Sequence, residues 1–321
     1  MNRFFARLAE KVSITKLKFK LKRTTTLFGF GLFCFLLPAY MWADRPNLLL
    51  MLTDDLGWRD LSCYGSTFYE TPNIDRMATQ GMRFTDAYAA ATVCSPTRAA
   101  VLTGKTPARL HITDFISGLE YPYTALKPPN WQREYLPHNE VTLAEMLKQA
   151  GYETFYFGKW HLGDTEGRFP TDQGFDEWIG IPRSSDRAFW PDSNSFTPSS
   201  HPDAVFTRVM SSKRGETPVE LEVFGREKRK TMDREITDQS IDFMKRKASE
   251  DKPFFVFLSY TQTHEPVDPH PDYYGKTGNG SFADVLAQTD DYVGEILDTV
   301  DGLGLKDNTI VIFTSDNGRE G

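Results

Sequence analysis

The sequence of 321 residues contains few cysteines, no internal repeat and no low-complexity tract. Its composition, 40% hydrophobic and 25% charged, excludes a disordered or fibrous protein and is typical of a globular chain with one large or two modest domains. Its three cysteines are Cys34, Cys63 and Cys94, and the first lies in an N-terminal segment that we expect to be removed. At most one disulfide, between Cys63 and Cys94, therefore remains possible in an oxidising compartment.

Beyond the first 43 residues, basic residues are fewer than acidic ones. That segment holds eight of the 37 Lys and Arg residues but one of the 44 acidic residues. Without it, 29 basic residues face 43 acidic ones, a net charge of about −14. Nucleic acid is excluded as a partner on this balance, and an anionic substrate would need a local pocket whose cations outweigh the general field.

The N-terminal segment, residues 1–43, has the order of a secretory signal peptide. A basic region precedes the apolar run LFGFGLFCFLL (27–37), and Ala43 offers a small residue for cleavage. The alternative is an uncleaved membrane anchor, because residues 26–43 approach the shortest length that spans a bilayer. No other apolar run is long enough to span. We therefore expect an exported protein, periplasmic or secreted, that meets a membrane only if this segment is retained, with a single domain over 44–321.

Four apolar runs predict strands, and helical patterns lie between them. The runs are PNLLLML (46–52), ETFYFG (153–158), PFFVFLS (253–259) and TIVIFT (309–314). Because they lack polar alternation, they suit strands buried on both faces of a mainly parallel sheet. Thr142 and Glu145 form a capping box for a helix that ends at Gly151. Ser281 is expected to cap a longer helix that ends near Gly302. This alternation predicts a layered α/β domain.

The segment from about 181 to 230 is rich in Pro, Ser and Asp and shows no periodicity. We interpret it as a long surface loop that selects the substrate, since long loops in compact domains are often functional. Its Trp190 and Phe196 could stack on a sugar, although ordinary packing within a loop explains them equally well.

Two pairs of polar residues directly follow predicted strands. Asp54 and Asp55 come after the first run, and Asp316 and Asn317 come after the last. The carboxyl ends of parallel strands lie at one edge of the sheet, where open α/β folds build their sites. Either pair alone is more often a turn or a helix cap. Together they form an all-oxygen ligand set that favours Ca²⁺, with Mg²⁺ as the alternative, and not zinc.

The stretch VCSPTR places Cys94 at the start of a predicted helix. Pro96 suits the first turn of a helix, and good helix formers continue to Gly104. The positive end of the helix dipole at Cys94 favours an anion, and Arg98, one turn further along, can face the same space. Cys94 is therefore a candidate nucleophile that attacks, or becomes, an anionic ester.

Lysine and histidine side chains complete the set of candidates. Lys159 and His161 follow a predicted strand, and on an extended backbone both would point the same way. His264 follows the strand at 253–259, where an imidazole could protonate a leaving oxygen.

These motifs resemble a known family. The residues CSPTR (94–98) resemble the C-x-P-x-R signature of type I sulfatases, and GKWHLG (158–163) is similar to their second signature. Further segments are similar to others of that family, in the same order: RPNLLLMLTDDLGWRDLSCYG (45–65), TPNIDRMATQGMRF (71–84) and SDNG (315–318). The resemblance covers nearly all of the chain beyond residue 44.

The resemblance implies an alkaline phosphatase-like α/β fold and an enzyme that releases sulfate from a sulfated carbohydrate or an aryl sulfate. It implies that a formylglycine-generating enzyme converts Cys94 to formylglycine (3-oxoalanine), whose hydrate is the nucleophile. A sulfated diol can expel sulfate by collapsing to the aldehyde, whereas a sulfated serine would be a stable ester. The implied ligands of Ca²⁺ are Asp54, Asp55, Asp316, Asn317 and an oxygen on modified Cys94.

The resemblance also implies roles for the cations and the histidines. Arg98 and Lys159 would stabilise the diol and the developing sulfuryl charge. His161 would take the proton released when the aldehyde re-forms, and His264 would donate to the leaving oxygen or to sulfate.

Two alternatives stay open. A phosphodiester or phosphonate monoester hydrolase of the same superfamily can share the cysteine, although ordinary phosphatases present Ser or Thr and a site for two zinc ions. The chain ends four residues after Asn317, before the lysine and the small C-terminal domain with which the family continues. We therefore expect a fragment or a natural truncation, and an inactive fragment that binds sulfated glycans is the second alternative.

Overall fold

The computed structural model describes residues 45–116, 131–188, 207–250 and 252–319. By its internal contacts the chain divides into Met1–Arg45 and Pro46–Gly321, and the described fold belongs to the second unit. Segment 1–43, Trp190 and Phe196 lie outside the described residues. Within those residues, every helix is too short or too polar to cross a membrane.

Seven strands form one sheet in the order β5-β4-β3-β2-β6-β1-β7. Their bounds are β1 Asn47–Thr53, β2 Glu153–Lys159, β3 Glu177–Ile181, β4 Arg208–Lys213, β5 Val219–Val223, β6 Phe254–Ser259 and β7 Thr309–Ser315. The five strands from β3 to β7 in this order pair in parallel, whereas β4 and β5 pair antiparallel at the edge. The four apolar runs are thereby confirmed as the parallel neighbours β2, β6, β1 and β7.

The prediction of one long loop from 181 to 230 is wrong. This stretch contains β4, β5 and the start of a helix at Arg226, together with residues that the structure does not describe. The strand β5 reads VELEV, and every residue of it is exposed. Alternating acidic and apolar residues suit an exposed edge strand, and the Pro- and Ser-rich residues before it obscured this short signal.

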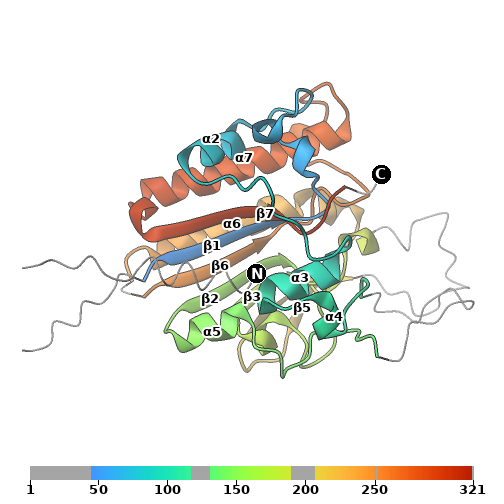
Figure 1. Ribbon diagram of the computed structural model, residues 1–321, viewed down its shortest axis with the longest axis vertical. Coiled ribbons are helices and arrows are strands. Elements are labelled where there is room, and N and C mark those ends of the chain that lie inside the picture. The colour runs from blue at the N-terminus through green and yellow to red at the C-terminus, as the bar shows by residue number, and fades with distance from the viewer. Residues whose placement is uncertain (1–44, 117–130, 189–206, 251, 320–321) are drawn as a thin grey trace, which may run out of the picture. The chain divides into compact units, whose positions relative to one another are not determined.

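Helices cover both faces of the sheet, as Figure 1 shows. One face carries α2 Pro72–Gln80, α6 Arg226–Lys247 and α7 Ser281–Gly302, and the other carries α3 Cys94–Thr103, α4 Pro107–Leu110 and α5 Leu143–Gln149. Short 3₁₀ helices occupy Trp58–Asp60, Ser62–Tyr64, Pro170–Gln173, Ser185–Ala188, Pro271–Tyr273 and Lys306–Asn308. Alternate residues of one strand enter different cores: Phe155 and Phe157 face α6, and Tyr156 faces α3 and α5. This confirms the predicted layered α/β fold.

The predicted helix ends are confirmed at the start of α5, at the end of α3 and at the end of α7, and one is wrong at the start of α7. Thr142 and Glu145 make the reciprocal hydrogen bonds of a capping box at the start of α5. The helix α3 ends before Gly104, whose φ of 68° suits glycine. Ser281, in contrast, is the first residue of α7 and does not cap it, because Gly280 occupies the cap position. Asp284 instead accepts hydrogen bonds from the preceding loop, at Gly275 and Thr277.

A glycine brings β2 close to its neighbours immediately before the candidate site. Gly158 has a φ of 103°, and a Cβ atom there would lie 1.8 Å from the carbonyl oxygen of Ser259 on β6. A Cβ atom at Gly180 on β3 would lie equally close to the carbonyl oxygen of Gly158. The three strands can therefore meet this closely only with glycine at both positions. This close contact sets Lys159, the last residue of β2, beside Ser259.

Candidate active site

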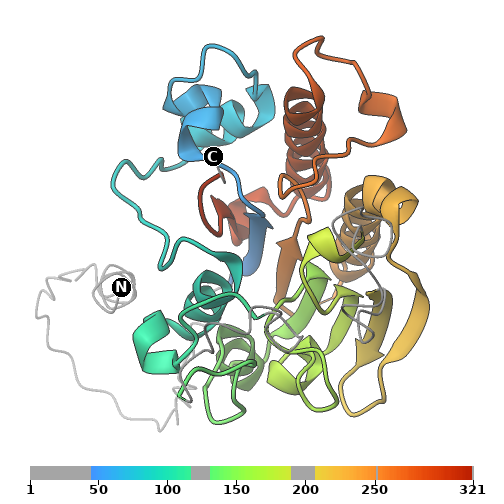
Figure 2. The same ribbon diagram turned by 90° about the vertical axis from the view of Figure 1, so that its right-hand side faces the viewer.

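Both predicted polar pairs lie at the carboxyl edge of the sheet, which Figure 2 faces. The parallel register of β1 and β7 pairs Thr53 with Ser315, so the residues that follow are neighbours. The amide of Asp55 donates to Oδ1 of Asp316 at 3.2 Å. Nδ2 of Asn317 donates to Oδ1 of Asp55 at 2.5 Å. The structure therefore brings the two pairs together.

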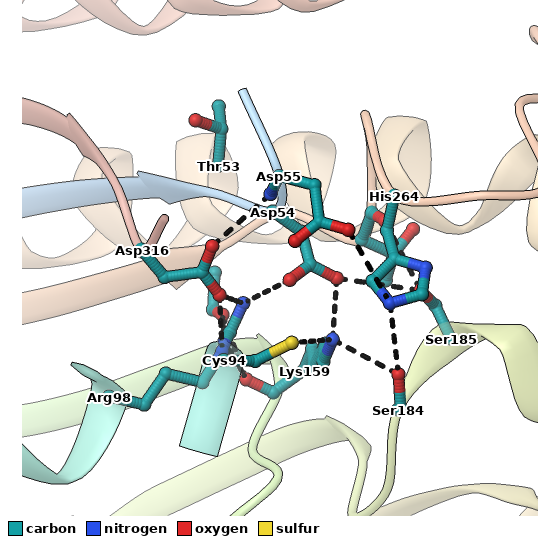
Figure 3. A network of polar contacts seen from close by, with 12 residues as sticks. Thr53, Asp54, Asp55, Cys94, Arg98, Lys159, Ser184, Ser185, His264 and Asp316 are labelled. Carbon is teal, nitrogen blue, oxygen red and sulfur yellow. Dashed lines mark hydrogen bonds and ion pairs between the residues drawn. The ribbon is translucent and has the colours of Figure 1, made fainter. Parts of the chain in front are cut away.

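Cys94 opens α3 and is buried against these carboxylates (Figure 3). Its Sγ atom and carboxylate oxygens of Asp54 and Asp316 all lie within 4.8 Å of one another. Cys94 and Cys63 are both free, so the disulfide alternative is wrong. Burial, aided by the two carboxylates, raises the pKa of the Cys94 thiol although Lys159 opposes this. An unmodified Cys94 is therefore a neutral thiol and a poor nucleophile.

Arg98 reaches across the site from the next turn of α3. Its Nε donates to Oδ2 of Asp316 at 2.9 Å, and its Nη2 donates to Oδ1 of Asp54 at 3.0 Å. Its Nη1 donates to the carbonyl oxygen of Lys159 at 2.9 Å and to Oγ of Ser259 at 2.7 Å. Burial alone would lower the pKa of Arg98, but the two carboxylates raise it, so the guanidinium keeps its charge.

Lys159 lies between the carboxylates and the thiol. Its Nζ is 2.6 Å from Oδ2 of Asp54, 3.5 Å from Sγ of Cys94 and 3.2 Å from Oγ of Ser184. Burial alone would lower its pKa, but the charge of Asp54 raises it above the usual value. Lys159 is thus a fixed positive charge that touches the candidate nucleophile.

His161 is buried near these charges, but not through the extended backbone that we expected. Its φ of 59° departs from strand geometry, because the chain turns as soon as β2 has ended. Its Nε2 lies 2.9 Å from the carbonyl oxygen of Ile116, so this nitrogen carries the proton. Burial and the charges of Lys159 and Arg98 hold the pKa of His161 well below its usual value. The ring is therefore neutral, and its buried Nδ1, to which the described residues give no partner, is a proton acceptor.

His264 lies in the same network of polar contacts, beside Asp55 and Ser184 (Figure 3). Its Nδ1 lies 2.6 Å from the carbonyl oxygen of Glu265, to which it donates. Its Nε2 lies 3.6 Å from Oδ2 of Asp55 and 3.5 Å from Oγ of Ser184. The ring therefore presents one nitrogen to the group of carboxylates and cations.

Sequence reasoning missed several polar residues of the site. Ser184 bridges Lys159 and His264, and Ser185 lies 3.5 Å from Oδ2 of Asp54. Both follow β3, a strand that the sequence pattern did not reveal. Their position directly after that strand is the signal that could have identified them.

The described residues fit a divalent cation. Three buried carboxylates, those of Asp54, Asp55 and Asp316, lie beside two buried cations. These cations, Lys159 and Arg98, hold the pKa of Asp54 well below its usual value against the effect of burial. Burial and the charge of Asp54 raise the pKa of Asp316 to about 7, and they raise that of Asp55 as well. The side-chain oxygen of Asn317 is buried without a hydrogen-bond partner among the described residues. A bound divalent cation beside these oxygens would lower the raised pKa values of Asp55 and Asp316 and would give the side-chain oxygen of Asn317 a partner.

A groove away from this site lies among the described residues. It has a volume of about 700 Å³ and lies between α6 and the strands β2 to β5, where it is lined by Phe155, Ile179, Ser211 and Gln239 among others. Two of its basic residues pair with acidic neighbours, Lys213 with Glu177 and Lys245 with Asp242. We place the chemistry at the carboxyl edge of the sheet because the reactive groups gather there.

Comparisons with known proteins give one consistent family. A family model described as Sulfatase matches residues 46–321. N-acetylgalactosamine-6-sulfatase of Homo sapiens is 38% identical over 277 residues, which cover 85% of this chain and 50% of that protein. Arylsulfatase A of Homo sapiens is 36% identical over 285 residues, which cover 87% of this chain and 53% of that protein.

A solved structure agrees with these relatives. The sulfatase PsFucS1 from Pseudoalteromonas sp. superimposes with a TM-score of 0.72 at 28% identity, covering 85% of this chain and 55% of that one. The chain thus spans about half the length of the curated relatives that it matches.

Proposed function

This chain belongs to the sulfatase family, and we propose that it hydrolyses sulfate esters of carbohydrates or aryl alcohols. The observation that carries the proposal is the position of Cys94. It lies at the start of a helix, in contact with Lys159 and close to Asp54, Asp316 and Arg98 in one buried group. The names of the relatives support sulfated carbohydrates and aryl sulfates as the substrate class.

Cys94 is proposed to be converted to formylglycine by a formylglycine-generating enzyme. The hydrate of this aldehyde carries two hydroxyls on one carbon. The burial of Cys94 supports this, because it raises the pKa of the thiol and leaves it a poor nucleophile before conversion. A sulfur atom is also a poor ligand for a hard cation, whereas an oxygen at the same place would suit one.

A Ca²⁺ ion is proposed to bind at Asp54, Asp55, Asp316 and Asn317, with Mg²⁺ as the alternative. When bound, it would supply the positive charge that polarises an oxygen held at residue 94. The all-oxygen donor set and the buried, unpaired Oδ1 of Asn317 support a hard cation in this place.

The cations and the histidines have complementary tasks. Lys159 and Arg98 hold fixed positive charge where sulfuryl oxygens would gather, in a site that is largely closed to water. Nδ1 of the neutral His161 takes a proton. Nε2 of His264 donates to the leaving oxygen when the ring is protonated at both nitrogens, since Nδ1 already donates to the carbonyl oxygen of Glu265. Ser184, which touches both Lys159 and His264, orients the bound ester.

The choice between sulfate and phosphate esters tests the proposal. The chain, co-expressed with a formylglycine-generating enzyme and supplied with Ca²⁺, is expected to release sulfate from an aryl sulfate. Phosphate release from the matched aryl phosphate, phosphodiester or phosphonate monoester should be slower. Faster turnover of a phosphorus ester would favour a hydrolase of that kind, and no turnover of either would contradict the proposed activity.

His161→Asn is expected to lower kcat by about 100-fold and to leave KM nearly unchanged, since a lost proton acceptor affects the chemical step. Steady-state kinetics on an aryl sulfate measure both constants. His138→Gln is the control, because His138 is exposed and should keep full activity. Equal kcat values for His161→Asn and the parent chain would remove His161 from the mechanism.

A further inference from the structure

The segment that carries His264 is held by two side chains of α6. After β6 ends at Ser259, residues Thr261–Pro266 follow its carboxyl end, and the backbones of Gln262 and Thr263 are hydrogen-bonded to that of Asp54. Arg229 and Asp233 contact this segment from α6, and they lie on the same face of that helix because they are four residues apart. Both side chains are fully buried or nearly so.

Asp233 binds the beginning of this segment with both carboxylate oxygens. Oδ1 accepts from the amide of Thr261 at 2.9 Å and from its Oγ1 at 2.9 Å. Oδ2 accepts from the amide of Gln262 at 3.0 Å. The next residue, Thr263, donates its amide to the carbonyl oxygen of Asp54, so the segment is tied to the candidate metal site as well.

Arg229 binds the end of the segment. Its Nη2 donates to the carbonyl oxygen of His264 at 2.5 Å, and its Nε donates to that of Pro266 at 3.0 Å. The backbone of His264 is thus fixed by α6, while Nδ1 of the ring is fixed by the carbonyl oxygen of Glu265. These bonds leave Nε2 of the ring aimed at Asp55 and Ser184.

Burying the charged side chains of Arg229 and Asp233 in apolar surroundings costs desolvation free energy. Neighbouring positions of α6 bury Met232, Ile236 and Phe243 in the apolar core. Burial raises the pKa of Asp233 to about 6 and lowers that of Arg229, so the helix keeps both groups against a desolvation cost. Their hydrogen bonds to the segment offset that cost, and apolar side chains at these positions could not make them.

We propose that Arg229 and Asp233 form a clamp that positions His264 for catalysis, with Arg229 fixing the backbone of the histidine itself. The two are positioning residues that act through His264 and do not touch the substrate. The inference rests on the proposed function, in which Nε2 of His264 donates to the leaving oxygen.

A double-mutant cycle tests whether Arg229 acts through His264. Arg229→Met keeps the length of the side chain and removes its donors, and it is expected to lower kcat about 10- to 100-fold with little change in KM. In the His264→Ala background the same substitution should cause no further loss, because the group that it positions is gone. Equal losses in both backgrounds would overturn the proposal.

Two further variants separate positioning from general damage to the fold. Arg229→Lys keeps one donor and should recover part of the lost kcat. Arg234→Met is the matched control on the same helix: Arg234 pairs with Glu295 and Asp238 at the surface, and its loss should leave kcat unchanged. A kcat loss in Arg234→Met as large as that in Arg229→Met would also overturn the proposal.

A spectroscopic measurement tests the clamp without any turnover. In protein labelled at histidine Cε1, the His264 resonance is assigned by its absence in His264→Ala. At one fixed pH, Arg229→Met should shift or broaden this resonance and leave that of His138 in place. An unmoved His264 resonance would refute the clamp even if the enzyme is active. A shifted resonance without sulfate release would uphold the clamp and count against the proposed function instead.

Discussion

Cys94→Ala is expected to lower the rate of sulfate-ester hydrolysis by about 10⁴-fold or more, since losing a nucleophile removes the covalent route and leaves only binding and electrostatic assistance. The side chain is small and sits at the start of α3 in contact with Lys159, so alanine should leave the fold intact. Sulfate release from an aryl sulfate measures the rate, and the thermal transition checks the fold.

Cys63→Ala is the matched control for this prediction. Cys63 is the other free cysteine of the described chain and lies beside Asp75, in a different group of contacts. It should retain full activity. Mass spectrometry of the peptide that contains Cys94, after co-expression with the maturing enzyme, should show the aldehyde, which is lighter than the unmodified thiol. An active protein with an unmodified Cys94 would contradict the assigned chemistry.

Calcium is expected to raise the melting temperature by about 5 °C at a concentration 100 times its Kd, since binding to the folded state alone contributes about 2.7 kcal/mol. Chelation should also abolish sulfate release, because charge stabilisation worth several kcal/mol would be lost. Differential scanning fluorimetry with and without Ca²⁺ measures the first effect, and an assay in EDTA measures the second.

The gain from calcium should depend on pH in a definite direction. Burial and the charge of Asp54 raise the pKa of Asp316 from 3.8 to about 7 in the metal-free fold. Without metal, the stability that this carboxyl contributes is fully present below its unfolded pKa and is lost as pH rises toward 7. Protons compete with calcium below pH 7, so the calcium-dependent gain should be largest near pH 8 and shrink as pH falls.

Asp316→Asn provides the test of the site itself. This variant removes one of the three carboxylates, so it should lose most of the calcium response and its pH dependence. Asp307→Asn changes an exposed carboxylate before the amino end of β7, at the opposite end of this strand from the site, and should behave like the parent protein. A calcium response that survives in Asp316→Asn would place the ion elsewhere.

Reading the sequence predicted the central parallel strands because their signal is strong and local. Residues such as Leu49 and Val256 belong to unbroken apolar runs, which suit strands that are covered on both faces. The antiparallel strands β4 and β5 were not predicted, since both are short and contain polar residues, and β5 is exposed throughout. An edge strand is held by its neighbour more than by its own composition.

The candidate site was predictable as a set of residue types, but not as a set of contacts. Asp54, Cys94 and Lys159 follow or precede elements that the pattern located, so their place at the carboxyl edge could be expected. Ser184 could not be found in this way, because the strand before it was missed. The backbone of His161 turns where an extended chain was expected.

The sequence by itself determined which chemical groups this protein carries and the type of fold in which they lie. Only the tertiary structure decided which of them meet. The order β2-β6-β1-β7 sets Arg98 against Asp316, 218 residues away, and places Arg229 beneath His264. The physical reason is that strand order and helix packing are set by burial over the whole domain. Contacts between distant polar groups, and the pKa shifts that follow, therefore leave no local trace in the sequence.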